Sequence, residues 1–206
     1  MAKNDNSVNI NSLGEAAKET ESERYHHGDL RSALLEEGLK RLKNAPAEAL
    51  SLREVARNVG VSATAVYRHF PDKAALLNAL SDVGGERMAD AFQTAMASAK
   101  PGRDAFNAMG RTYVRFALAN PSLFKLMMTP DTEGGKTPGD RKKARGMGML
   151  TGALSELSGG KMSSEEQNIR RLQAWSIVHG LAMLMLDGMI SIDDSLVDQV
   201  LETKFV

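Results

Sequence analysis

Residues 51 to 73 hold the densest group of polar side chains that could bind another molecule. They combine hydroxyl, phenol, guanidinium, imidazole and ammonium groups, at Ser51, Ser62, Thr64, Tyr67, Arg68, His69 and Lys73. Groups of this kind form hydrogen bonds with phosphate oxygens and with the edges of bases. Their clustering within two dozen residues predicts contact with a nucleic acid.

Evidence for catalysis or for a metal site is weak by comparison. The chain has no cysteine, which excludes thiol catalysis and thiolate metal sites and suits a reducing cytoplasm. His179 and Asp187 are eight residues apart on one expected helix, a spacing that does not bring them face to face, and no Gly-x-Ser-x-Gly motif accompanies them. The side chains of His26 and His27 diverge by about 100° if they lie on a helix. We therefore expect no metal, no cofactor and no enzymatic activity.

The segment from residue 51 to residue 72 has the pattern of two short helices followed by a longer one. Ser51 with Glu54 three residues later predicts a capping box that opens a helix through residue 58. Gly60 permits a tight turn, and Ser62 is expected to cap a second helix that ends near residue 70. Asp72 is expected to cap a long helix from residue 73. The order is that of a helix-turn-helix.

The residues of this segment divide into an inner and an outer face. Ala56 is small, as required where two helices cross closely, and valines at positions 55, 59, 61 and 66 would fill the wedge between the helices. The outer face of the second helix then presents Ala63, Thr64, Tyr67 and Arg68 to a major groove. A plain helical hairpin in a protein core is the alternative, and it leaves these outward polar groups without a use.

The rest of the chain also has helical periodicity. Leucines from residue 30 to residue 42 repeat at helical spacing, and no sustained alternation of apolar and polar residues indicates a strand. Breaks between further helical stretches fall at residues 101–102, 120–121, 129–139, 158–161 and 191–194. We predict an all-α fold of about nine helices.

Residues 25–80 resemble the N-terminal domain of the TetR (tetracycline-repressor-like) family of transcriptional regulators. The resemblance rests on Tyr-His-His-Gly-Asp-Leu at 25–30 and on Val-Tyr-Arg-His-Phe-Pro-Asp-Lys at 66–73. It implies that Thr64, with Ala63 beside it, contacts base edges. It also implies that Tyr67, His69 and Lys73 hold phosphates, as Ser51 and Ser62 could through hydroxyls or helix amides. Arg68 is open to three interpretations: guanine contact, phosphate contact or solvent.

A second resemblance lies downstream. Trp175-Ser-Ile-Val-His179-Gly180 is similar to the Trp-His-Gly type of C-terminal domain found in part of the same family. The expected helix around it is apolar nearly all round, so a second subunit is predicted to cover one side. We assign this homodimer interface to Ile177, Leu181, Leu184, Val197, Val200 and Leu201. A twofold dimer implies a palindromic operator in double-stranded DNA.

Methionines and aromatic residues in the C-terminal part are predicted to enclose a cavity. Methionine adapts to irregular apolar shapes, which suits a small hydrophobic effector. The candidate lining residues are Met88, Met109, Tyr113, Phe116, Met127, Met128, Trp175 and His179, with Arg115 as a polar contact. His179 has two open interpretations, a hydrogen-bonded core histidine or a ligand contact. A repressor released by such an effector is the expected function, and a DNA-bound protein-interaction module without an effector is the alternative.

The charge is distributed unevenly along the chain. Residues 1–23 hold two basic and five acidic residues, whereas residues 24–80 hold nine basic and six acidic ones, although the whole chain is neutral. We divide the chain into a disordered tail (1–23), a DNA-binding domain (24–80) and an effector-binding and dimerisation domain (81–206). The alternative for the acidic tail is an arm that reaches DNA. The mildly basic charge of the DNA-binding domain predicts weak affinity for random DNA.

The remaining sequence predicts where the protein is located in the cell and one position where a long helix could bend. No secretory signal or membrane span is visible, so a bacterial cytoplasmic protein, associated with the nucleoid when bound, is expected. Gly84 and Gly85 fall within the long helix from residue 73, where each glycine disfavours helix by roughly 1 kcal/mol relative to alanine. A bend that transmits ligand binding and a close helix contact are both open interpretations.

Overall fold

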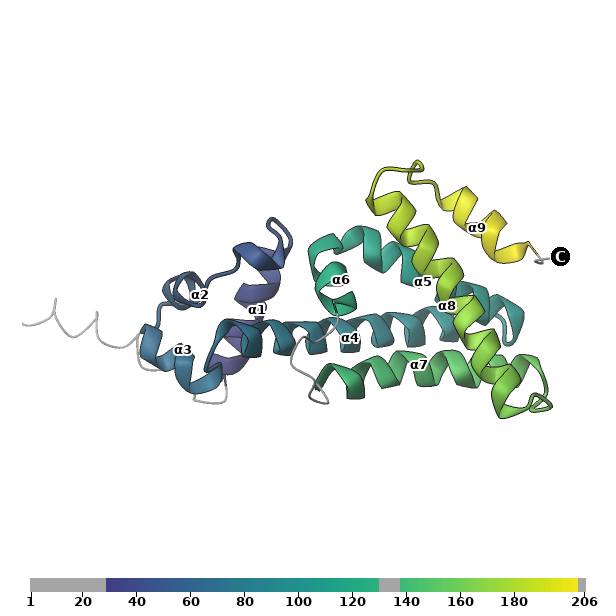
Figure 1. Ribbon diagram of the computed structural model, residues 1–206, viewed down its shortest axis with the longest axis horizontal. Coiled ribbons are helices and arrows are strands. Elements are labelled where there is room, and N and C mark those ends of the chain that lie inside the picture. The colour runs from purple at the N-terminus through teal and green to yellow at the C-terminus, as the bar shows by residue number, and fades with distance from the viewer. Residues whose placement is uncertain (1–28, 130–137, 204–206) are drawn as a thin grey trace, which may run out of the picture.

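A computed structural model describes residues 29–129 and 138–203, and every regular element within these ranges is helical (Figure 1). The predicted tail at 1–23, His26, His27 and most of the loop at 129–139 lie outside the described residues. The helices are α1 (Asp29–Leu42), a short 3₁₀ turn η2 (Ala47–Ala49), α2 (Leu52–Val59), α3 (Ala63–His69), α4 (Lys73–Ala97), α5 (Arg103–Ala119), α6 (Pro121–Met128), α7 (Pro138–Leu157), α8 (Ser164–Leu186) and α9 (Asp194–Glu202). The predicted all-α fold is confirmed. None of the helices in the described ranges is long and apolar enough to cross a membrane.

Helices α1, α2 and α3 pack on the first turns of α4 and form the head of the molecule, at one end of Figure 1. Val55 and Val66 have no exposed surface, and Ala56 is buried where α2 and α3 meet. Gly60 ends α2 with a φ of +79°, a conformation that costs glycine little and other residues more. The predicted helix-turn-helix is therefore present, with Val55 and Val66 inside it and Val59 and Val61 partly buried against its core.

Two of the three predicted caps in the head are confirmed, and one is wrong. The Ser62 side chain accepts a hydrogen bond from the Ala65 amide at 3.2 Å, and the Asp72 carboxylate accepts one from the Ala75 amide at 2.7 Å. Ser51 occupies the N-cap position of α2, but its side chain makes no capping hydrogen bond. The carboxylate expected to complete that capping box, Glu54, instead pairs with arginines 41 and 57.

Helix α4 is the element shared by the two ends of the molecule. It runs without a break from Lys73 to Ala97, so the glycine pair does not interrupt it, and the domain boundary predicted at residue 80 falls inside it. A Cβ atom added at Gly84 would lie 2.7 Å from Met127 Sδ and 3.0 Å from Leu123 Cδ1. The interpretation of close helix packing is confirmed at Gly84.

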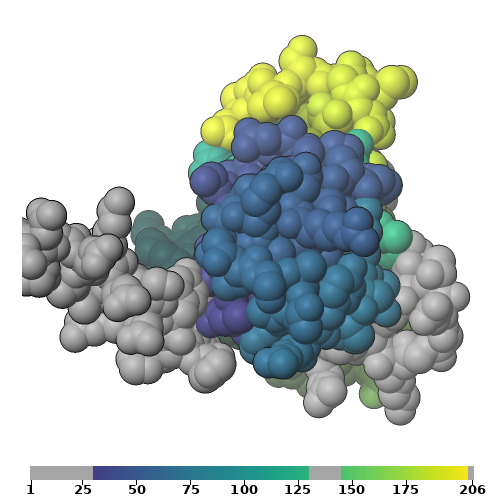
Figure 2. Space-filling model, turned by 90° about the vertical axis from the view of Figure 1, so that its left-hand side faces the viewer, coloured from purple at the N-terminus to yellow at the C-terminus, as the bar shows by residue number. Residues whose placement is uncertain are grey.

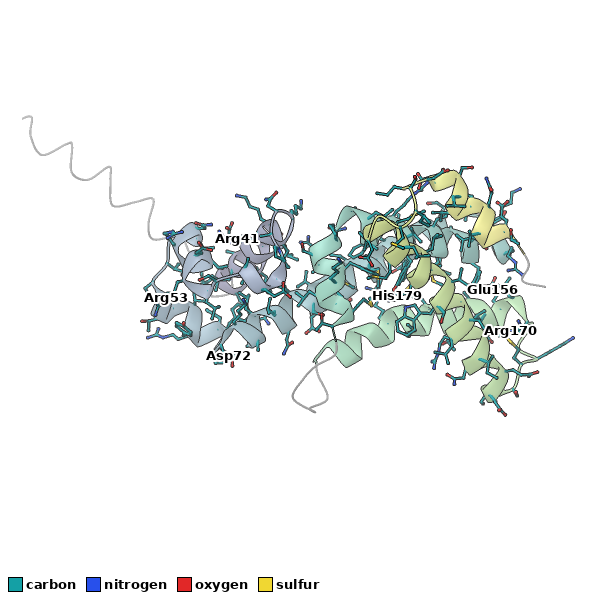
Figure 3. The ribbon with its side chains drawn as sticks, turned by 45° about the horizontal axis from the view of Figure 1, so that its top comes forward. Arg41, Arg53, Asp72, Glu156, Arg170 and His179 are labelled. Carbon is teal, nitrogen blue, oxygen red and sulfur yellow. The ribbon has the colours of Figure 1, made fainter. Side chains whose placement is uncertain are left out.

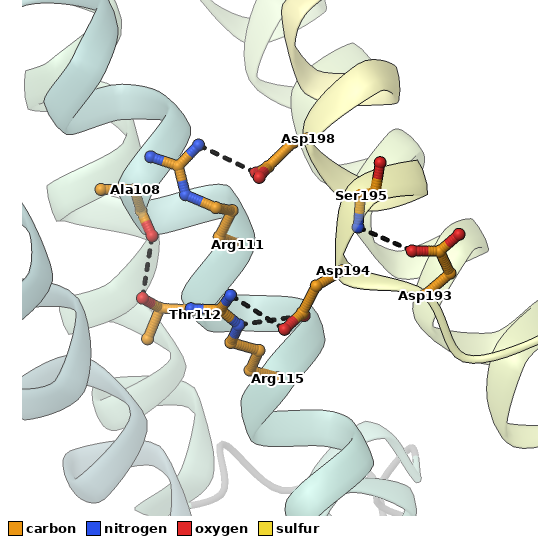
Figure 4. A network of polar contacts seen from close by, with 8 residues as sticks. All are labelled: Ala108, Arg111, Thr112, Arg115, Asp193, Asp194, Ser195 and Asp198. Atoms are coloured by element: carbon orange, nitrogen blue, oxygen red, sulfur yellow. Dashed lines mark hydrogen bonds and ion pairs between the residues drawn. The ribbon is translucent and has the colours of Figure 1, made fainter.

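The remaining helices build a second apolar core around the far half of α4. Arg145 on α7 pairs with Glu86 at 2.9 Å and with Asp90 at 2.7 Å, which ties α7 to α4. Helix α9 is tied to α5 in the same way, by Arg111 with Asp198 and by Arg115 with Asp194, both at 3.0 Å (Figure 4). The apolar side of α9 consequently faces α5 of its own chain.

Candidate nucleic-acid interface and internal cavity

The outward face of α3 has the polar residues that the sequence predicts. Ala63, Thr64, Tyr67 and Arg68 are exposed, while Val66 on the opposite face is fully buried. Within the described part of the chain, the side chains of Thr64, Tyr67 and Arg68 form no hydrogen bond or ion pair, so they are available to a partner. Figure 2 looks onto the head, with the surface of α1 to α3 in front and α9 above it.

The other predicted DNA contacts are less accessible. Ser51 and His69 are half-buried, and the hydroxyl of Ser62 is engaged in capping α3. The Lys73 ammonium donates a hydrogen bond to the backbone carbonyl of Glu48, which holds it at the base of α4. These residues surround the α3 face rather than belong to it, a placement that suits phosphates better than bases.

A cavity of about 1510 Å³ lies among α4, α5, α6, α7, α8 and α9. Seven of the eight predicted lining residues line it: Met88, Met109, Tyr113, Met127, Met128, Trp175 and His179. Phe116 does not, because its side chain packs where the two apolar cores meet. Arg115 does not supply the polar contact either, since its guanidinium pairs with Asp194.

The polar centre of the cavity wall is a hydrogen-bonded group of three aromatic side chains. The Trp175 indole N–H donates to the Tyr113 oxygen at 3.0 Å, and the same oxygen lies 3.0 Å from His179 Nδ1. Phe124 packs edge-on against Tyr113, with ring centroids 5.5 Å apart. Burial raises the pKa of Tyr113 to about 12, so the phenol keeps its proton at neutral pH. His179 is hydrogen-bonded to Tyr113, as one of its two interpretations requires, and it also lines the cavity, so the ligand contact stays a prediction (Figure 3).

Most of the predicted dimer interface faces the interior of its own chain. Leu181 and Val197 are buried at 7% and 2% exposure in the second core of their own chain, so they offer a partner little surface. Ile177, Val200 and Leu201 line the cavity. Among the six predicted residues, only Leu184 is exposed. The reason is that α5 already covers the apolar side of α9.

Sequence reasoning missed several residues of the cavity. Asn107 is buried, its Oδ1 has no hydrogen-bond partner in the described part of the chain, and it lies three residues before Gly110 on the inner side of α5. An amide at a buried helical position is a signal that periodicity alone could have revealed. Charged side chains also line the cavity, at Arg103, Asp104, Arg170, Arg171 and Glu202. Among the described residues, no three His, Asp or Glu side chains are grouped as a metal site would require.

Similar proteins of known structure share this fold. A protein of unknown function from Rhodococcus sp. RHA1 is 32% identical, with a TM-score of 0.73 over 87% of this chain and 93% of that one. A TetR family transcription regulator from Marinobacter aquaeolei VT8 is 20% identical, with a TM-score of 0.63 over 84% of this chain and 92% of that one. The nucleoid occlusion factor SlmA of Idiomarina loihiensis is 24% identical over 155 residues, 73% of this chain and 76% of that protein.

Two family descriptions match the two ends of the chain. Residues 34–80 match the bacterial regulatory proteins of the tetR family, and residues 106–204 match the tetracyclin repressor-like C-terminal domain. Together the matched ranges cover more than half of the sequence. They coincide with the helix-turn-helix and with the helices around the cavity. The chain therefore belongs to the TetR family of DNA-binding transcriptional regulators.

Proposed function

We propose that this regulator is a repressor that leaves a palindromic operator when a small hydrophobic effector occupies its cavity. The observation that carries the proposal is the position of Met127. Its side chain lines the cavity and is also buried in the core of the head, against Gly84 of α4. A ligand that displaces Met127 therefore acts directly on the packing between α6 and the helix that carries the head.

The proposed DNA contacts follow from exposure and from hydrogen-bonding capacity. Thr64, with Ala63 beside it, reads base edges, because both are exposed on the face of α3 opposite the buried Val66. Tyr67 and Arg68 on the same face bind bases or phosphates, and Ser51, Ser62, His69 and Lys73 bind the backbone on either side. Nothing else in the described part of the chain competes for the Thr64, Tyr67 and Arg68 side chains.

Selection of bound sites from random DNA tests the base-reading role. We expect the full-length protein to select a palindrome and Thr64→Ala to select a relaxed or altered half-site. Thr94→Ala is the matched control, because Thr94 is an exposed threonine on α4 whose hydroxyl bonds only the Asp90 carbonyl. Equal losses of affinity on operator and random DNA for Thr64→Ala would refute the role of Thr64.

Release is tested by operator binding in the presence of apolar compounds. Met109→Trp places a larger side chain in the part of the cavity wall that belongs to the second core alone, and is expected to reduce release without changing operator affinity in the absence of ligand. If no compound that binds the protein weakens operator binding, the proposed effector control is wrong.

The proposed homodimer uses the exposed side of α8. Ile169, Leu172 and Leu184 are exposed at 48%, 48% and 45% on this side, an unusual surface for large apolar residues. Ser176 and Gly180 lie between them at helical spacing, and a Cβ atom at Gly180 would meet nothing within 4 Å. A second copy of α8 fits here, since small residues let two helix backbones approach closely. Sedimentation of Leu172→Lys with Leu184→Lys is expected to show monomers.

One observation favours the alternative of a protein-interaction module. Met189 and Ile192, in the loop between α8 and α9, are exposed at 72% and 69%. A protein partner could cover them, and one relative is a nucleoid occlusion factor. The cavity favours the effector-controlled repressor, which is expected to work in the bacterial cytoplasm at the nucleoid.

A further inference from the structure

The Tyr113 oxygen has three polar neighbours, one that donates to it and two that could accept its proton. Trp175 Nε1 and His179 Nδ1 both lie 3.0 Å from it, and the sulfur of Met128 lies 3.9 Å away. The indole nitrogen is only ever a donor, so it occupies a lone pair of the phenol oxygen. The phenol proton must then go to the histidine nitrogen or to the sulfur.

The histidine nitrogen is the better acceptor. A thioether sulfur accepts hydrogen bonds weakly, whereas a neutral imidazole nitrogen at 3.0 Å accepts a strong one. The phenol therefore donates to Nδ1, which places the single proton of a neutral His179 ring on Nε2. The chain of hydrogen bonds runs from Trp175 through Tyr113 to His179 and leaves one N–H group at its end.

That terminal N–H group has no partner of its own in the described part of the chain. His179 forms no other hydrogen bond there, and it lines the cavity. Its ring packs among aromatic neighbours, with centroids 5.8 Å from both Phe124 and Trp175. A ligand beside His179 therefore meets an oriented donor among aromatic neighbours.

The arginines that line the cavity on α5 and α8 lie several helical turns from Tyr113 and His179 along their own helices. The nearest arginine along α8 that lines the cavity, Arg171, is eight residues from His179, or about 12 Å along the helix axis. On α5 the corresponding residue, Arg103, is about 15 Å from Tyr113 by the same rise per residue. A carboxylate at His179 would lose its hydration without a nearby cation, whereas a neutral carbonyl oxygen needs only the N–H.

We propose that the cavity selects ligands with an uncharged hydrogen-bond acceptor, a ketone, ester or amide carbonyl, which accepts from His179 Nε2–H while the remaining apolar body fills the space among the methionines. This inference depends on the proposed function in one respect: it takes the ligand of the cavity to be the effector that releases the operator. His179 is the contact residue, and Tyr113 is a positioning residue that fixes which ring nitrogen carries the proton.

Trp175 makes the proposal measurable, because it is the single tryptophan of the chain and lies in the site. The full-length protein without DNA is titrated with 2-decanone, decanoate and decylammonium, and tryptophan fluorescence is followed. The ketone is expected to bind roughly tenfold more tightly than either ion, because decylammonium leaves the His179 donor unpaired and the decanoate carboxylate gives up its hydration. Equal binding of the three compounds, tighter binding of either ion, or no binding overturns the proposal.

Two variants separate the contact from its positioning. His179→Leu removes the donor and is expected to abolish the preference for the ketone. Tyr113→Phe keeps the ring but frees Nδ1, so either ring nitrogen can carry the proton, and the preference over decylammonium is expected to fall severalfold. Thr151→Val is the control, since Thr151 does not line the cavity and its hydroxyl bonds only the backbone carbonyl of Met147. An unchanged preference in His179→Leu overturns the assignment.

The two hypotheses fail in different ways. If the ketone binds in the expected order but leaves operator binding unchanged, the proposed release is wrong and the ligand class stands. If a charged compound both binds more tightly and releases the operator, effector control stands and the ligand class is wrong.

Discussion

A methyl group added at Gly84 would meet three atoms of α6 at once. Its Cβ would lie 2.7 Å from Met127 Sδ, 3.1 Å from Met127 Cγ and 3.0 Å from Leu123 Cδ1. Both side chains are almost fully buried, at 2% and 5% exposure, so a shift of either must be taken up within the core or, for Met127, in the cavity that it lines. The substitution Gly84→Ala therefore forces α4 and α6 apart or displaces Met127.

The expected free-energy change is the difference of two effects. Overpacking a buried contact costs about 1–3 kcal/mol, and alanine stabilises a helix interior by roughly 1 kcal/mol relative to glycine. We expect a net loss of about 1 kcal/mol of unfolding free energy for Gly84→Ala. The control is Gly152→Ala on α7, where a Cβ atom would meet nothing within 4 Å and the helix-forming gain remains alone. The two variants should differ by about 2 kcal/mol.

Urea unfolding followed by circular dichroism measures the difference. Both variants are compared at one protein concentration, because the stability of a dimer depends on concentration. If Gly84→Ala were as stabilising as Gly152→Ala, the contact between α4 and α6 would be soft, and the coupling argued from Met127 would lose its basis. Operator affinity and ligand release of the same variant then show whether a tighter α4–α6 contact changes the response.

Three further outcomes follow from the head and from α9. Ser62→Ala is expected to lower the unfolding free energy by about 1 kcal/mol, and Ser51→Ala much less, because only Ser62 makes a capping hydrogen bond; equal losses in urea unfolding would contradict this. Lys73→Met is expected to weaken binding to every DNA sequence and to reduce the slope of log affinity against log salt by about one. An unchanged slope would mean that Lys73 stays on its backbone carbonyl in the complex. The hydrogen bond from Arg115 lowers the pKa of Asp194 in the folded protein. The ionised carboxylate therefore stabilises the fold at any pH above its ordinary pKa of about 3.9. This stabilisation is lost as the pH falls through the lowered pKa of the folded state. The stability difference between wild type and Asp194→Asn should therefore be present at pH 7 and vanish in strong acid, and a difference that persists there would contradict the assignment.

The helix-turn-helix could be predicted because its constraints are local. Gly60 needs a left-handed backbone conformation, and Val55, Ala56 and Val66 must fit between two helices that are neighbours in sequence. These requirements can be recognised within a stretch of twenty residues. The outward placement of Thr64 follows from the inward placement of Val66 by helical geometry alone.

The sequence predictions failed where a contact with a segment far away in the sequence determines the pairing or burial of a residue. Glu54 did not complete a capping box, since Arg41 on α1 reaches it from thirteen residues away. The apolar sides of α8 and α9 were assigned to a second subunit, because periodicity shows that a face is buried without showing which chain buries it. The ion pairs of Arg111 and Arg115 with α9 show that α5 of the same chain lies against α9, and they join residues about eighty positions apart.

The cavity was predicted in composition but not in its polar centre. Methionine content and the spacing of Trp175 and His179 pointed to the correct helices. The partner of both, Tyr113, is more than sixty residues earlier, so the hydrogen-bonded group becomes visible only in the fold. Phe116 was misplaced because it lies one turn from Tyr113 on a slightly different side of α5.

The contact of α6 with Gly84 limits how freely such a protein can be recombined. A chimera that exchanges the head at residue 80 would keep Leu123 and Met127 from one parent and give them a foreign partner surface, although both are part of the head core. The continuous α4 would also join two half-helices of different ancestry. A transplantable head therefore comprises α1 to α4 together with the buried residues of α6, and new DNA specificity is more safely introduced by exchanging only the exposed residues of α3.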